Sequence, residues 1–150
     1  MITALRAFFL INVACALAFA SYATGLSKVT LFQPVLPPPQ SEFENLSVQQ
    51  ARQIQQDQPE VLFVDARSRP GYDFNHLPGA ISLPVASTVD NTNLERLRRA
   101  PLVVVYCDSS HCGAALKLAQ KLSQMGLGPI KVMEDGMEGW LQSGLPTEKS

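Results

Sequence analysis

The residues best suited to chemistry lie in one short segment of the chain. It contains Cys107, Asp108, Ser109, Ser110, His111, Cys112 and Gly113. Branched residues precede this segment and a stretch with helical apolar spacing follows it. The first amides of a helix are unpaired and carry partial positive charge, so a nearby sulfur is favoured as the thiolate, which is its reactive form. The segment therefore predicts a nucleophilic cysteine, Cys107, in a loop between a strand and a helix.

The backbone of this loop is also expected to contribute. A short loop that closes on a helix can turn several N–H groups toward one point and so bind an anion. We expect the amides from Asp108 to Gly113 to surround the reacting sulfur in this way. His111 is placed to bond an anion or to tune the thiol, because imidazole titrates near neutrality; a solvent-facing histidine is the alternative. The alternative for Cys107 is a small buried hydrophobic residue.

Strand and helix patterns alternate around the loop. Strands are expected at 61–64, 80–83, 102–106 and 130–133, which are short apolar runs. Helices are expected over 47–56, 71–75, after Asn91, after the cysteine loop up to Gly126, and over 138–143. This alternation predicts an α/β fold with a parallel sheet and helices on both faces. Ligands bind beyond the carboxyl ends of such strands, where Cys107 lies.

The helix after the loop has the clearest amphipathic pattern. Its apolar face is expected to contain Ala115, Leu118, Ala119, Leu122 and Met125. Lys117 and Lys121 belong to the opposite face, so we expect both to point into solvent.

Four separated motifs resemble those of the rhodanese-like domain, in the same order and with the same spacing over residues 42–147. They are Val64-Asp65-Ala66-Arg67, the segment from Gly71 to Pro84, Val105-Tyr106-Cys107, and the segment from Asp135 to Trp140 with Gly144-Leu145-Pro146. The resemblance implies a three-layer α/β fold with a central parallel sheet flanked by helices. It also implies transfer of sulfane sulfur through a cysteine persulfide, with no metal or organic cofactor. The implied partners are a small sulfur-containing donor and a thiol or other nucleophilic acceptor, which includes a protein thiol.

The resemblance assigns roles to individual residues. Cys107 becomes the catalytic nucleophile, Asp65 and Arg67 a supporting pair beside the active loop, His76 a turn-packing residue and Trp140 a core residue.

The chain departs from the family pattern at one position. Members of the family often carry an arginine five residues after the cysteine, where this chain has Cys112. Asp108 adds a negative charge beside the nucleophile, which repels an anionic donor such as thiosulfate. The missing guanidinium also removes support for phosphoryl transfer.

Cys112 leaves several alternatives open. It can resolve a persulfide, close a disulfide with Cys107 if the Cα atoms lie within about 7 Å, or fill the position before the helix. Two rival functions follow: a dithiol redox module that uses Cys107 and Cys112, and a catalytically silent binding module. A metal site is not expected, because no fourth ligand accompanies Cys107, His111 and Cys112.

The ends of the chain complete the predicted organisation. One hydrophobic helix is expected to precede the domain, because residues 7–26 carry no charge and suit the core of a bilayer. Arg6 before it and Lys28 after it favour a single-pass anchor with the domain extracytoplasmic, hence periplasmic in a bacterium; a cleaved secretory signal is the alternative. Residues 1–26 thus form the anchor or signal, 27–41 a proline-rich linker and 148–150 a tail. The net charge of −1 gives no support for a nucleic-acid partner.

Overall fold

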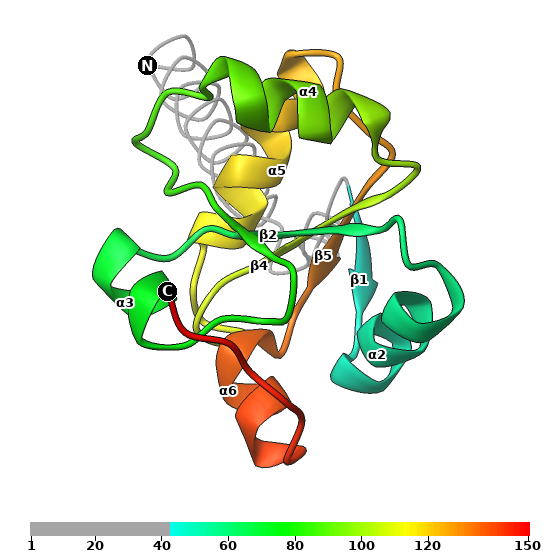
Figure 1. Ribbon diagram of the computed structural model, residues 1–150, viewed down its shortest axis with the longest axis vertical. Helices are drawn as coiled ribbons and strands as arrows, with labels where there is room; N and C mark the ends of the chain where they lie inside the picture. Colours follow the sequence, from blue (N-terminus) through cyan, green and yellow to red (C-terminus); the bar gives the residue numbers. More distant parts are fainter. Residues whose placement is uncertain (1–42) are drawn as a thin grey trace, which may run out of the picture. The chain divides into compact units, whose positions relative to one another are not determined.

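Figure 1 shows a computed structural model of the chain, which describes residues 43–150. The predicted membrane segment at residues 7–26 and the predicted linker at 27–41 lie outside the described residues. Within residues 43–150, none of the helices has the length and hydropathy needed to cross a bilayer.

The described part of the chain is built on a parallel sheet of five strands. They are β1 (Glu44–Leu46), β2 (Leu62–Asp65), β3 (Ile81–Ser82), β4 (Val103–Tyr106) and β5 (Ile130–Met133), in the order β1-β5-β4-β2-β3. Every pair of neighbours is parallel. The centre of the sheet is β4, and all four of its residues are completely buried. A strand covered on both faces needs an apolar run without alternation, which is what its sequence supplies.

Helices cover both faces of the sheet, as the alternating pattern predicted. They are α2 (Val48–Asp57), α3 (Arg69–Phe74), α4 (Asn91–Arg99), α5 (Ala114–Gln124) and α6 (Gly136–Gln142). Figure 1 shows α4 and α5 on one side of the strands and α2 and α6 on the other. The side chain of Tyr72 places α3 with α2 and α6, because it belongs to the same buried cluster.

The pleat of β4 determines which of the two helix layers Cys107 packs against. Val103 and Val105 point into the cluster beneath α4 and α5, whereas Val104 and Tyr106 point into the cluster on the other face. Cys107 continues the first set and packs in the cluster that includes Ala115 of α5. The strand register therefore directs the sulfur of Cys107 toward the helix that follows its loop.

Local signals in the sequence were sufficient to predict most of the helices and strands. The capping box that begins α2 is confirmed, since the side chain of Ser47 accepts from the amide of Gln50 and the side chain of Gln50 accepts from the amide of Ser47. Residues 130–133 form β5 as expected. The last helix begins at Gly136, two residues earlier than predicted, and β1 was not predicted.

Two predictions for α5 are wrong. Met125 ends the helix with 46% of its surface exposed, because it lies beyond the last turn that packs on the sheet. Lys121 does not point freely into solvent: its ammonium donates to the carbonyls of Val85, at 3.0 Å, and Ser87, at 2.6 Å. It thereby ties the connection between β3 and α4 to α5.

Candidate functional site

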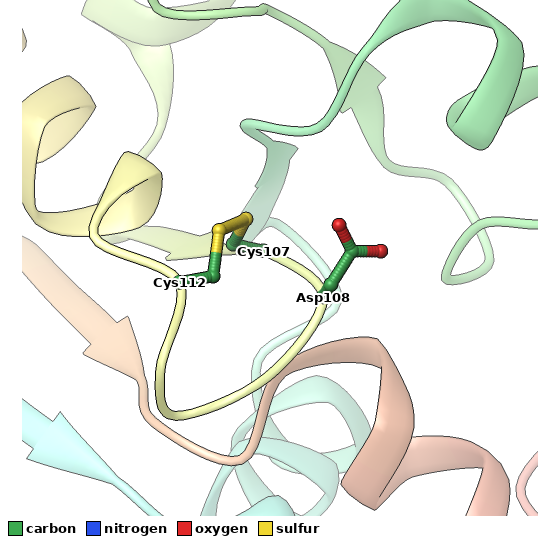
Figure 2. Close-up of side chains that lie close together, drawn as sticks. All are labelled: Cys107, Asp108 and Cys112. Carbon is green, nitrogen blue, oxygen red and sulfur yellow. A yellow bond between two sulfur atoms is a disulfide. The ribbon is translucent and has the colours of Figure 1, made fainter.

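Cys107 and Cys112 form a disulfide that closes the loop between β4 and α5. Figure 2 shows the two sulfur atoms joining the two ends of the loop, with the Asp108 side chain projecting beside them. The Cα atoms are 6.2 Å apart, within the separation of about 7 Å that a disulfide tolerates. The structure therefore adopts one of the alternatives that the sequence left open for Cys112.

The two sulfurs differ in accessibility. Cys107 is only 3% exposed, because it lies at the end of the central strand and under α5. Cys112 is half-buried and lines a cavity of about 170 Å³, whose wall also includes Leu116 of α5 and Val132 and Glu134 from the region of β5. The site therefore presents Cys112 toward solvent and keeps Cys107 behind it.

The start of α6 holds the first two residues of the loop. The amide of Met137 donates to the carbonyl of Cys107 at 2.7 Å, and the amide of Glu138 donates to the carbonyl of Asp108 at 2.8 Å. Gly136 makes this approach possible: its φ is +60°, and a Cβ atom there would lie 2.6 Å from the carbonyl oxygen of Cys107. The sequence did not assign this role to Gly136, because the close approach depends on how α6 packs against the loop.

Arg67 connects the loop to the interior of the sheet. It is 7% exposed, and its Nη2 lies 2.7 Å from a carboxylate oxygen of Asp65, which is fully buried. Its Nη1 lies 3.6 Å from the carboxylate of Asp108. Burial opposes the charge of Arg67, but the hydrogen bond and the charge of Asp65 outweigh burial, so the pKa of Arg67 is raised. The predicted pair of Asp65 and Arg67 thus also contacts the loop between β4 and α5, through Asp108.

The buried carboxylate of Asp65 affects a second neighbour. Burial raises the pKa of Tyr106, and the negative charge of Asp65 raises it further. The hydroxyl oxygen of Tyr106 accepts from the amide of Leu77 at 3.1 Å. The neutral tyrosine therefore connects the buried pair of Asp65 and Arg67 to the backbone at Leu77.

The remaining loop residues are more exposed. The amide of Cys112 donates to the carbonyl of Ser109 at 3.0 Å, so it does not point at the sulfur atoms as we expected for the amides from Asp108 to Gly113. His111 is exposed, and its Nδ1 lies 3.4 Å from the hydroxyl of Ser110. Gly113 is the N-cap of α5, and its carbonyl accepts from the amide of Lys117.

The donor set does not fit a metal centre in this oxidised form. Among residues 43–150, Cys107, Asp108 and Cys112 bring three potential ligand atoms within 4.8 Å of one another. Both sulfurs are bonded to each other, so neither is a thiolate. A structural zinc site needs four donors, and only Asp108 of this group keeps a free one.

The other residues that the sequence singled out are structural. Trp140 is fully buried and its indole nitrogen donates to the carbonyl of Pro146, which confirms a core role. His76 is buried, stacks on Tyr72 with ring centroids 3.8 Å apart, and contacts the carbonyl of Tyr72 through Nδ1 at 2.9 Å. Its backbone pairs with that of Glu148, so the predicted tail at 148–150 contacts the domain.

The fold and the site define an α/β domain in which Cys107 follows the central strand of a parallel sheet. Residues 47–143 match the family described as the rhodanese-like domain. The chain therefore belongs to the rhodanese-like domain family, which is related to sulfurtransferases.

Curated relatives match this chain over part of their own length. An HTH-type transcriptional regulator of Mycobacterium tuberculosis is 33% identical over 90 residues, which are 60% of this chain and 38% of the regulator. An uncharacterized protein of Synechocystis is 36% identical over 107 residues, which are 69% of this chain and 54% of that protein. The chain thus spans about half or less of the length of these relatives.

Solved structures show the same fold at lower identity. The BH2092 protein of Bacillus halodurans is 24% identical with a TM-score of 0.61, over 88% of this chain and 84% of its own. A thiosulfate sulfurtransferase of Pseudomonas aeruginosa is 24% identical with a TM-score of 0.58, over 71% and 20%. The 3-mercaptopyruvate sulfotransferase of Escherichia coli is 19% identical with a TM-score of 0.57, over 72% and 51%.

Proposed function

We propose that the protein is a sulfurtransferase that carries sulfane sulfur as a persulfide on Cys107. The observation that carries this proposal is the position of Cys107 at the carboxyl end of the central strand, in a loop that leads directly into α5. Parallel sheets bind ligands at this edge. The unpaired amides that begin α5 favour negative charge on a sulfur held near them.

The proposed reaction has two steps and begins from the reduced protein. The Cys107 thiolate attacks the outer sulfur of a persulfide donor; the bond between the two donor sulfurs breaks, and the donor leaves as a thiolate. A nucleophilic acceptor, such as a protein thiolate, then attacks the outer sulfur of the Cys107 persulfide. This second step regenerates the Cys107 thiolate.

The negative charges near the loop favour a neutral sulfur donor over an anionic one. Asp108 is 70% exposed, and the carboxylates of Glu134 and Glu138 line the two cavities beside the loop. Arg67 contacts Asp108, but its guanidinium is also paired with the buried carboxylate of Asp65. An anionic donor such as thiosulfate therefore meets repulsion that a low-molecular-weight persulfide in its neutral form does not.

A second candidate function is a dithiol redox module, and the disulfide itself favours it. Cys107 and Cys112 are already paired, so the loop can exchange two electrons with a dithiol partner without any persulfide. The two functions differ in what Cys112 does, because only the redox module requires both sulfurs in every turnover.

We further propose that the domain is extracytoplasmic and tethered to a membrane through residues 7–26. The support is the uncharged apolar run together with Arg6 before it and Lys28 after it. An oxidising compartment is compatible with the disulfide.

A sulfur-transfer assay separates the two functions. The full-length chain would be purified in mild detergent with Cys15→Ser as background, reduced, and supplied with a persulfide donor and a thiol acceptor. We expect Cys107→Ser to abolish transfer and Cys112→Ser to retain it. The redox function would instead be supported if the parent protein transfers no sulfur and both variants lose thiol–disulfide exchange.

A further inference from the structure

We propose that the thiol that reduces the disulfide attacks the sulfur of Cys112, that Cys107 is the leaving group, and that the cavity beside Cys112 selects uncharged or cationic thiols. This inference rests on the proposed function in one respect, because it describes the step that returns Cys107 to the thiolate form.

The direction of approach distinguishes the two sulfurs. Thiol–disulfide exchange proceeds by attack of a thiolate on one sulfur while the bond to the other breaks, so the attacking group must reach the far side of the attacked atom. The far side of Cys107 is the core between β4 and α5, where Cys107 is 3% exposed. Cys112 instead lines the cavity of about 170 Å³ beside the loop. The cavity therefore leads to Cys112.

The environment of Cys107 also suits a leaving group. When a partner thiolate bonds to Cys112, the electron pair of the broken bond moves to Cys107, which becomes a thiolate. That sulfur lies beside the start of α5, an 11-residue helix whose first amides carry partial positive charge. A second thiol then attacks the mixed disulfide and releases Cys112, so two thiols are oxidised and one disulfide is reduced.

The charges of the cavity predict which thiols react well. Glu134 lines it, and Asp135 and Glu138 line the neighbouring cavity of about 270 Å³ on the other side of the loop. Of the described residues that line these two cavities, none is a lysine or an arginine. Leu116, Val132 and Met133 supply apolar wall. A thiol with a negative group is repelled here, and a cationic thiol is attracted.

In this order of events, the reducing thiol and the sulfur donor react with different cysteines. Electrons enter through Cys112, and sulfur is accepted by Cys107 after the bond between them is broken. The bond to Cys112 is what blocks Cys107 in the oxidised form, so reduction at Cys112 makes the Cys107 thiolate available to the donor.

Mapping of the first adduct tests which sulfur is attacked. The oxidised full-length chain in detergent, with Cys15→Ser as background, is treated with limiting cysteamine while iodoacetamide captures the thiol released first. Fragmentation mass spectrometry then locates the two groups within one peptide. We expect cysteamine on Cys112 and the alkyl group on Cys107. The reverse arrangement would overturn the proposed order.

Reaction rates test the charge preference. Second-order rate constants per thiolate are compared for cysteamine, 2-mercaptoethanol and 2-mercaptoethanesulfonate at low salt. We expect the rate constant for cationic cysteamine to exceed that for anionic 2-mercaptoethanesulfonate by about threefold to tenfold. This is the range for one charge pair in a largely solvated site. Glu134→Gln should narrow this ratio. Glu60→Gln is the matched control, since Glu60 is exposed and lines a cavity at the amino end of β2. Equal rates, or equal effects of both substitutions, would overturn the charge preference.

Sulfur loading of the reduced protein is measured separately. If cysteamine attacks Cys107 and the reduced protein still gains one sulfur, this inference is wrong and the proposed function stands. If cysteamine attacks Cys112 and the reduced protein gains no sulfur, the order of attack stands and the proposed function is wrong.

Discussion

Arg67 holds Asp108 from inside the domain: its guanidinium Nη1 lies 3.6 Å from the Asp108 carboxylate, while its Nη2 contacts buried Asp65. Asp108, which follows Cys107, is thereby linked to the end of β2. This contact, the two amides of α6 and the disulfide together fix the position of the loop.

Replacing Arg67 should destabilise the domain strongly. Arg67→Met leaves the fully buried carboxylate of Asp65 without its cation, and an uncompensated buried charge costs about 3–5 kcal/mol. Arg69→Met is the control, because its pair with Asp73 is solvent-exposed and contributes less than about 1 kcal/mol. Urea unfolding of both variants measures the difference. Equal losses of stability would contradict a strong stabilising role for the contact between Arg67 and Asp65.

Removing the charge of Asp108 should change donor preference more than stability. Asp108 is 70% exposed, so its ion pair contributes less than about 1 kcal/mol. Asp108→Asn removes one negative charge beside the sulfur, and we expect sulfur loading from thiosulfate to become about threefold to tenfold faster. Loading from a neutral donor should hardly change. Asp57→Asn, at the exposed end of α2, serves as the control. A rate with thiosulfate that stays at the parent value would argue against electrostatic exclusion.

Gly136 should not accept alanine. The substitution places a Cβ atom 2.6 Å from the carbonyl oxygen of Cys107 and forces an L-residue to a φ of +60°. Gly144→Ala shares the positive φ, at +65°, but its Cβ atom meets nothing within 4 Å. Because overpacking adds about 1–3 kcal/mol to the backbone strain, Gly136→Ala should lose that much more stability than Gly144→Ala. The comparison by urea unfolding isolates the contact with the loop.

Tyr106 should make the stability of the domain sensitive to alkaline pH. Its pKa in the folded protein is raised above the ordinary value of about 10. The folded state therefore holds a proton that the unfolded state releases, so this contribution is present below about pH 10 and is lost as pH rises further. Tyr106→Phe removes the effect, and its stability should decline less steeply above pH 10 than that of the parent. Parallel slopes in unfolding curves collected across this range would contradict the assignment.

The sequence predicted the elements whose signals are local. The capping box of Ser47 and Gln50 located α2, and the branched run before Cys107 located β4. The edge strand β1 was missed, because its three residues form a strand only by pairing with β5, more than 80 residues later. Helical spacing also predicted that Met125 lies on the buried face of α5, whereas its side chain is exposed.

The same distinction applies to the site. The residue pattern was enough to place Cys107 after a strand, and the separation of five residues made a disulfide with Cys112 one of the expected alternatives. The contact of Arg67 with Asp108 and the fit of Gly136 under the Cys107 carbonyl depend on how β2 and α6 pack against the loop. Such contacts between distant parts of a chain leave no local pattern in the residues that make them.

The most direct test of the account is the intact mass of the reduced full-length protein after incubation with a low-molecular-weight persulfide. Cys15→Ser is the background, and Cys107→Ser and Cys112→Ser are measured beside it. We predict a gain of one sulfur atom in the parent and in Cys112→Ser, and none in Cys107→Ser. No gain in any of the three proteins, or an equal gain in Cys107→Ser, would contradict a persulfide carried on Cys107.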